Sequence, residues 1–286
     1  MHTTSDSANV RALCARWRQD GASVGFVPTM GALHQGHMSL LERSQRDCDR
    51  TVVSIFVNPT QFDRAEDLAS YPSDPSVDLE KLQAAACDAA FLGSPDALYG
   101  PGYVTWVSCE GPLTEGLCGR ARPGHFRGVT TIVAKLFNIV QPTRAYFGRK
   151  DLQQLSIIRR MAQDLDMPTE VIGCPTVREP DGLALSSRNA LLSPEGRERA
   201  LAISGSLSEA GRRYRAGDRR SAGLLTMIRA ALTQAGARVD YIAAVDGPSL
   251  EPRDVLDDDA HIALAAFVDG VRLIDNHRVS EGPLRP

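Results

Sequence analysis

The sequence predicts an α/β protein in which a doubly wound parallel sheet is followed by a smaller α+β domain. Short apolar runs alternate with longer amphipathic stretches from residue 23 to residue 174, which is typical of repeated strand–helix units. After residue 177 two long amphipathic stretches come together, and the last strands follow without a helix between them. We therefore expect two domains, 1–176 and 177–286, with a boundary near Val177.

The expected elements follow from apolar periodicity and from Pro and Gly at their ends. Apolar runs predict strands over 23–27, 51–57, 88–92, 103–107, 144–147 and 169–174. Amphipathic spacing predicts helices over 10–19, 73–86 and 152–165, one after residue 37, and a long apolar helix that ends at Val140. Residues 1–9 are polar and are expected to form a frayed tail. The second domain should contain helices over 194–216 and 220–235 and strands over 241–245, 261–268 and 272–275.

Composition limits the classes of partner. The 286 residues are 43% hydrophobic, enough for a real core, and the net charge of −3 with a pI near 6.1 gives no general surface for nucleic acid or membrane. No apolar run approaches the length needed to cross a bilayer. The six cysteines show no metal-ligand spacing and predict reduced thiols in a cytoplasmic protein.

The most informative stretch runs from residue 28 to residue 37 and reads PTMGALHQGH. It lies between a predicted strand and a predicted helix, and a helix start suits anions because its N–H groups and positive dipole end are available. Gly31 and Gly36 allow a ligand close to the backbone. His34 and His37 are three residues apart, so both could donate to phosphoryl oxygens from one face.

Further polar groups follow other predicted strands or begin helices. Asn58 and Gln61 follow the strand over 51–57 and Lys150 follows the strand over 144–147, which places them at the carboxyl edge where open α/β sheets bind ligands. Arg122 and His125, with Arg127, cluster where the long helix begins, as expected if they face an anion. Two hydroxyls and a guanidinium in the segment 186–188 could bind phosphate, or the segment could belong to the cap of the helix that starts at Ser193-Pro194-Glu195.

Five ordered motifs together resemble the pantothenate synthetase (pantoate–β-alanine ligase) family, within the Rossmann-like nucleotidylyltransferase superfamily that carries His-x-Gly-His. The resemblance runs from about Gly25 to Asn276 and ends with RLIDN at 272–276. The motifs are PTMGALHQGH at 28–37, FVNPTQF at 56–62, RPGHF at 122–126, YFGRKD with QQ at 146–154, and DGLALSSRN at 181–189.

The resemblance implies an ATP-dependent ligase that forms pantoyl adenylate and pyrophosphate, then passes the pantoyl group to β-alanine and releases AMP. It implies His37, His34 and Lys150 as catalytic residues, Mg²⁺ with ATP, and a homodimer whose C-terminal domain closes over the active site. Pantoate and β-alanine would be bound by Gln61, Gln154, Asn58, Arg122 and His125. ATP would be bound by Met30, Gly31, Ala32, Leu33, His34, Gln35, Gly36, His37, Gly148, Arg149, Lys150, Asp151, Val177, Leu185, Ser186, Ser187 and Arg188. The resemblance gives no metal ligands, and the role of Asp78 stays open.

Three other interpretations compete with this one. The first is an adenylyltransferase of the same superfamily. If it made a dinucleotide-like product, it would transfer to a phosphate acceptor and would have no use for Gln61 and Gln154; it could also act on another small acid. A relative of the tRNA synthetases would need a basic surface, which the net charge argues against. A nucleotide sensor without catalysis would not need Lys150, His34 and His37.

Overall fold

The structure is a computed structural model that describes residues 1–69 and 71–284. The chain divides into two compact units, each made of separate stretches of sequence. The first unit comprises Met1–Glu110, Arg122–Arg149 and Ile157–Cys174. The second comprises Gly111–Ala121, Lys150–Ser156 and the chain from Pro175 onward. The predicted boundary near Val177 stays a prediction, but the two added stretches show that the second unit also draws on the middle of the sequence.

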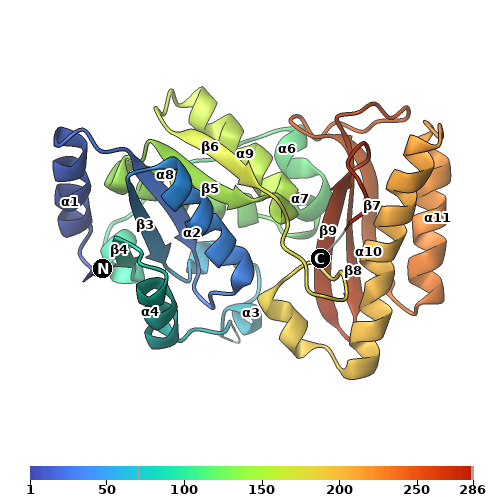
Figure 1. Ribbon diagram of the computed structural model, residues 1–286, viewed down its shortest axis with the longest axis horizontal. Coiled ribbons are helices and arrows are strands. Elements are labelled where there is room, and N and C mark those ends of the chain that lie inside the picture. Colours follow the sequence, from blue (N-terminus) through green and yellow to red (C-terminus); the bar gives the residue numbers. More distant parts are fainter. Residues whose placement is uncertain (70, 285–286) are drawn as a thin grey trace. The chain divides into compact units, whose positions relative to one another are not determined.

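The first unit contains a six-stranded parallel sheet in the order β1-β4-β3-β2-β5-β6 (Figure 1), which confirms the predicted doubly wound fold. Chain order runs outward from β2 through β3 to β4, then returns past β2 to β5 and β6. The point of reversal therefore lies between β2 and β5, where open α/β sheets bind their ligands. The strands are β1 His2–Thr4, β2 Val24–Thr29, β3 Arg50–Ile55, β4 Ala89–Leu92, β5 Arg144–Gly148 and β6 Glu170–Cys174.

Both faces of the sheet are buried, and alternating side chains of the strands pack against helices on the two faces. Val27 and Tyr146 pack with Leu40 and Leu41 of α2 on one face. Phe26, on the opposite face, meets Phe137 of α8 edge to face with ring centroids 6.4 Å apart. The helices of this unit are α1 Ser7–Gln19, α2 Gln35–Asp47, α3 Ala65–Ala69, α4 Pro75–Ala84, α5 Pro95–Leu98 and α8 His125–Val140, with the 3₁₀ turn η1 Pro59–Gln61. The 3₁₀ turn η2 Arg149–Asp151 and the helix α9 Leu152–Asp164 each contain residues of both units.

Two predicted elements were wrong. The tail over 1–9 is not frayed: His2–Thr4 pairs with β4 as a parallel edge strand, and Asp6 caps α1 by accepting from the Ala8 N–H. Residues 103–107 do not form a strand, and at the last of them hydroxyl groups of α8 bond the backbone in place of a neighbouring strand. The Val107 N–H donates to Thr131 Oγ1 at 3.0 Å, and its carbonyl accepts from Thr130 Oγ1 at 2.6 Å.

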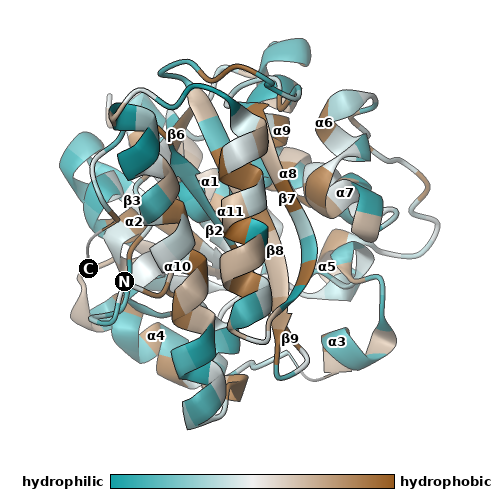
Figure 2. Cartoon of the chain, turned by 90° about the vertical axis from the view of Figure 1, so that its right-hand side faces the viewer, coloured by the Kyte–Doolittle hydropathy of each residue, from teal (hydrophilic) through white to brown (hydrophobic). Residues whose placement is uncertain are grey.

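The second unit contains a three-stranded antiparallel sheet, β7 Arg238–Asp246, β8 Ala260–Val268 and β9 Val271–Arg278, in that order. Figure 2 shows the long helices α10 Pro194–Arg215 and α11 Ser221–Gln234 beside these strands, of which β8 is largely hydrophobic. Leu207, Leu224 and Ile228 of the helices are fully buried against Ile262 and Leu264 of β8. This unit also holds α6 Pro112–Glu115, α7 Leu117–Ala121 and the 3₁₀ turn η3 Ser187–Leu191.

All six cysteines are free thiols and five are buried, as expected of core residues in a reduced protein. In the part of the chain that the structure describes, no helix is both long enough and apolar enough to span a membrane.

Candidate functional site

The loop between β2 and α2 has a strained start that a buried carboxylate holds in place. Gly31 and Ala32 both adopt positive φ, +85° and +50°. Asp78 of α4, 2% exposed, accepts from the Ala32 N–H at 2.8 Å and the Leu33 N–H at 2.7 Å. Lys81, one turn further along α4, donates to the Leu33 carbonyl at 2.6 Å. A Cβ on Gly31 would lie 2.9 Å from the Asp78 carboxylate, so the turn requires glycine.

His34 and His37 complete the loop as a cap for α2. His34 is the N-cap residue, and its Nδ1 accepts from the Gly36 N–H at 3.1 Å. The His37 Nδ1 accepts from the His34 N–H at 3.3 Å, and the two rings stack with centroids 4.1 Å apart. Each accepting Nδ1 fixes a neutral tautomer with its proton on Nε2. The predicted pair is therefore brought together as two oriented N–H donors at a helix start.

The turn η1, which follows β3, places Gln61 beside that loop. The Gln61 Nε2 donates to Met30 Sδ at 2.9 Å, and its Oε1 accepts from Asn58 Nδ2 at 3.0 Å. Asn58 is 1% exposed and also accepts from the Tyr99 hydroxyl at 2.9 Å. Burial raises the pKa of Tyr99, which keeps its phenol protonated as a donor. Asn58 thus holds Gln61 in orientation.

Arg122 and His125 meet on the main-chain oxygen of Gln61. The Gln61 carbonyl accepts from Arg122 Nη2 at 3.2 Å and lies 2.6 Å from His125 Nδ1. Arg122 also pairs with Asp63 at 3.1 Å. The third cation of the predicted cluster, Arg127, lies instead over the ring of Trp106 at 4.9 Å. Arg122 and His125 therefore hold the turn that carries Gln61.

Helix α8 lies against η1 with no spare room. A Cβ on Gly128 would lie 2.4 Å from the Thr60 carbonyl oxygen, closer than such atoms ever come. Asn58 Nδ2 donates to the Gly128 carbonyl at 3.2 Å across the same contact. The position of Gln61 is thus set by direct backbone contact between the turn and the helix.

The two adjacent glutamines after β5, Gln153 and Gln154, differ in their contacts. Gln153 is 5% exposed, and its amide is fully used: Oε1 accepts from the Cys118 N–H at 2.9 Å, and Nε2 donates to the carbonyls of Leu113 and Gly116. Gln154 is half-buried and makes no side-chain hydrogen bond to any residue in the described part of the chain. Gln153 is therefore a structural residue, and the ligand-binding role of Gln154 stays a prediction.

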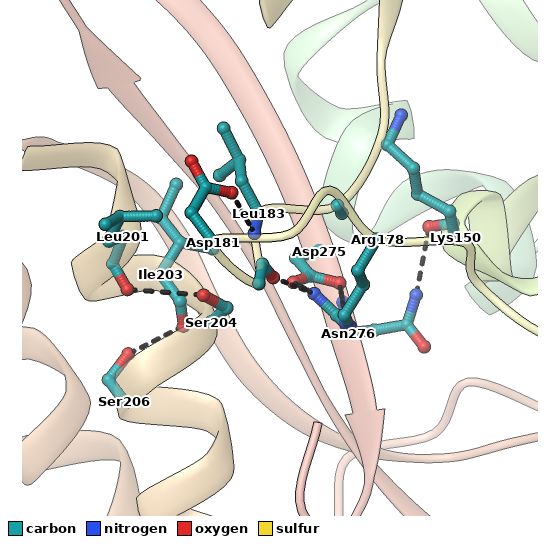
Figure 3. A network of polar contacts seen from close by, with 12 residues as sticks. Lys150, Arg178, Asp181, Leu183, Leu201, Ile203, Ser204, Ser206, Asp275 and Asn276 are labelled. Atoms are coloured by element: carbon teal, nitrogen blue, oxygen red, sulfur yellow. Dashed lines mark hydrogen bonds and ion pairs between the residues drawn. The ribbon is translucent and has the colours of Figure 1, made fainter. Parts of the chain in front are cut away.

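Two further parts of the predicted site, Lys150 and the segment Val177–Arg188, lie in the second unit. The main chain of Lys150 accepts a hydrogen bond from Asn276 of β9, and Arg178 forms a buried ion pair with Asp275 (Figure 3). The Leu185 N–H donates to the Val177 carbonyl at 3.0 Å, which folds the segment back on itself. Ser186 caps the 3₁₀ turn η3 by accepting from the Arg188 N–H at 3.3 Å, and the helix α10 is capped by Ser193 instead.

Comparisons with known proteins match almost the whole chain to one family. The family model described as pantoate–β-alanine ligase matches residues 2–278. A pantothenate synthetase from Syntrophotalea carbinolica is 48% identical over 282 residues, 98% of this chain and 99% of the relative. The chain belongs to the pantoate–β-alanine ligase family.

Solved structures of this family share the fold. The crystal structure of pantothenate synthetase from Thermus thermophilus has a TM-score of 0.93 at 45% identity, covering 98% of this chain and all of the other. The pantoate–β-alanine ligase from Francisella tularensis, described as complexed with β,γ-ATP and β-alanine, has a TM-score of 0.81 at 34% identity and covers 99% of both chains.

Two residues of α4 support the loop over 31–33: Asp78, whose role the sequence left open, and Lys81, which the sequence reasoning missed. A weak signal existed: Asp78 stands one turn before the buried Leu82, so a carboxylate shares the apolar face of its helix. A carboxylate buried on such a face needs donors, and the strained loop supplies them.

Proposed function

We propose that this protein condenses pantoate with β-alanine to form pantothenate, using ATP and passing through pantoyl adenylate. The observation that carries the proposal is the family match over residues 2–278, which includes every residue of the candidate site. ATP and β-alanine are the compounds named with the Francisella tularensis relative. The first step would release pyrophosphate and the second AMP.

Adenylation is an in-line attack of a carboxylate on the α-phosphorus, so the protein contributes mainly positioning and neutralisation of charge. The Nε2–H donors of His34 and His37 lie at the start of α2, where the helix dipole also favours phosphate. Lys150 would stabilise the charge that grows on the leaving pyrophosphate, and Arg188 would bind phosphate by a two-pronged contact.

Pantoate would be bound by Gln61 and Gln154. Both side chains are neutral, so they can orient the hydroxy acid without pairing with the carboxylate that must attack. Gln61 is held by Asn58, Arg122 and His125, which accounts for those three residues as supports of the substrate site. The amine of β-alanine then attacks the activated carbonyl and AMP leaves.

We propose that Mg²⁺ enters with ATP as part of the substrate. Within residues 1–69 and 71–284 no group of three or more His, Cys, Asp or Glu side chains could hold a metal ion. Asp78, the buried acid nearest the ATP loop, is already occupied by two backbone N–H groups. Mg²⁺ commonly binds through substrate phosphates and waters with few protein ligands, which fits these observations.

We propose further that the enzyme is a cytoplasmic homodimer. Six free cysteines favour a reducing compartment. The dimer rests on the family resemblance alone, and light scattering coupled to gel filtration tests it directly: a mass near twice 30.9 kDa is expected, and a mass near 30.9 kDa would contradict it.

The decisive experiment is exchange of labelled pyrophosphate into ATP. We expect exchange with pantoate and Mg²⁺, no need for β-alanine, and net pantothenate formation once β-alanine is added. Exchange driven by another small acid and not by pantoate would favour the general adenylyltransferase. Exchange driven by β-alanine alone would reject the order of steps. Binding of ATP with no exchange under any condition would leave a nucleotide sensor.

A further inference from the structure

The backbone of Lys150 is held by a residue 126 positions further along the chain. Asn276 of β9 donates from Nδ2 to the Lys150 carbonyl oxygen at 2.9 Å, and Asn276 is only 8% exposed. Both residues belong to the second unit. Figure 3 shows the ammonium end of Lys150 directed away from this contact. The amide therefore fixes the peptide that carries Lys150 while its charged end extends elsewhere.

The residue before Asn276 holds the other phosphate-binding segment of this unit. Asp275 accepts from Arg178 Nη1 at 2.7 Å and Nη2 at 3.0 Å, and the two side chains are 1% and 2% exposed. Arg178 Nη1 also donates to the Gly182 carbonyl at 3.1 Å. This two-pronged, buried pair fixes the bend that leads into Leu185–Arg188 (Figure 3).

Adjacent residues of one strand can contact two segments because successive side chains leave a strand in opposite directions. The strand itself is rigid: β9 pairs with β8 in continuous register from His261–Arg278 to Val268–Val271. The Asn276 N–H also donates to Asp275 Oδ1 at 2.8 Å, which ties the two residues together.

We propose that Asn276 is a positioning residue for Lys150, and that Asp275 and Asn276 together set the spacing between Lys150 and the segment that carries Arg188. The inference rests on the proposed function, in which Lys150 and Arg188 serve the phosphates of ATP. Neither Asp275 nor Asn276 needs to touch substrate. Asn276 acts through the backbone of Lys150, and Asp275 acts through Arg178, which holds the bend before the segment with Arg188.

Replacement of Asn276 by Ala should slow adenylation by about 10- to 100-fold, the scale expected when a catalytic group is displaced by about 1 Å. The second step, measured with supplied pantoyl adenylate and β-alanine, should stay within about twofold, since pyrophosphate has already left. Asn276→Asp keeps the shape but turns the donor into an acceptor that faces the Lys150 carbonyl, so it should be at least as slow as Asn276→Ala.

A double-mutant cycle separates positioning from a general structural role. We would measure pyrophosphate exchange for Lys150→Ala, Asn276→Ala and the double variant, together with their melting temperatures. If Asn276 acts through Lys150, the double variant is no slower than Lys150→Ala. Asn138→Ala is the matched control, because it removes another amide that donates to a main-chain carbonyl, on the exposed side of α8. The control should leave exchange unchanged.

Each remaining outcome overturns a defined part. If the two single losses of exchange rate multiply in the double variant, or if Asn276→Ala slows adenylation and the second step equally, Asn276 has a structural role and does not position Lys150. Full exchange by Asn276→Ala, Asn276→Asp or Lys150→Ala beside an active wild type would refute it while the proposed function stands. A wild type with no pantoate-dependent exchange would refute both.

Discussion

Replacement of Asp78 by Asn tests whether the loop over 31–33, which we propose binds ATP, depends on one buried carboxylate. The carboxylate accepts from the N–H groups of Ala32 and Leu33 at 2.8 and 2.7 Å with 2% of Asp78 exposed. An asparagine there can accept from only one of them and turns its own NH₂ toward the other. The perturbation therefore removes one charge-assisted hydrogen bond and leaves one buried N–H without an acceptor.

These losses set the expected magnitude. A hydrogen bond to a charged group contributes about 1.5–3 kcal/mol, and a buried unsatisfied donor costs about 1–3 kcal/mol. Because the loop can relax in part, we expect a total of about 2–3 kcal/mol. If the loop keeps its shape, this loss appears in the free energy of unfolding. If the loop opens in the free protein, ATP binding must close it, and ATP affinity falls by roughly 30- to 150-fold.

Urea denaturation and ATP titration measure the two quantities on the same variant. Asp74→Asn is the matched control, since Asp74 also accepts backbone N–H groups at the start of α4 and Asn is an equally good N-cap. The reasoning is refuted if Asp78→Asn changes both the free energy of unfolding and ATP affinity by no more than the control does.

Three further outcomes follow from the site and the core. Lys150→Ala should slow adenylation at least ~100-fold but leave the second step near the wild-type rate in single-turnover assays; a similar collapse of both would contradict its assigned role. Gln61→Ala should cost ~1–3 kcal/mol in kcat/KM for pantoate with ATP affinity almost unchanged, and an equal loss for both ligands would make Gln61 structural. Burial, followed by the charges of Arg215, Arg178 and His261, lowers the pKa of His277 from 6.5 to about 4. As the pH falls, the imidazole of His277 is protonated in the unfolded chain before it is protonated in the folded protein, so roughly 3 kcal/mol of stability should be lost between about pH 6.5 and pH 4. Urea denaturation of His277→Leu should show a smaller loss over that range. If the pH profile of the variant equals that of the wild type, the lowered pKa of His277 is contradicted.

The parallel sheet was predictable because its strands are short apolar runs that need no distant partner to be recognised. The strand over 51–57 and the loop with His34 and His37 were predicted correctly for that reason. The strand predicted over 103–107 was wrong; at Val107 the hydroxyls of Thr130 and Thr131, on a later helix, bond the backbone in place of a neighbouring strand. Nothing local to residues 103–107 shows such contacts.

The supports of the site were harder to find than the residues they support. The sequence motif contains both Gln153 and Gln154, and the resemblance assigned a substrate role to Gln154 alone. The structural role of Gln153 follows only from its distant partners in the stretch 113–118. The role of Asp78 was hidden for the same reason, because its partners Ala32 and Leu33 lie 46 and 45 residues earlier in the chain. Local patterns show which groups could bind a ligand, whereas long-range hydrogen bonds decide which of them are already in use.

If Gln61 binds pantoate, as we propose, the contact between Gly128 and Thr60 limits how this enzyme can change its substrate. Gln61 sits at the end of a turn whose backbone touches the backbone of a core helix, so any side chain at position 128 would push the turn and the glutamine with it. A random substitution at this interface would lower the stability of the fold and displace the side chain of Gln61 at the same time. Variants selected for a different hydroxy acid should therefore keep glycine at 128 and alter residues outside that contact, because there the recognition of the acid can change without disturbing the core.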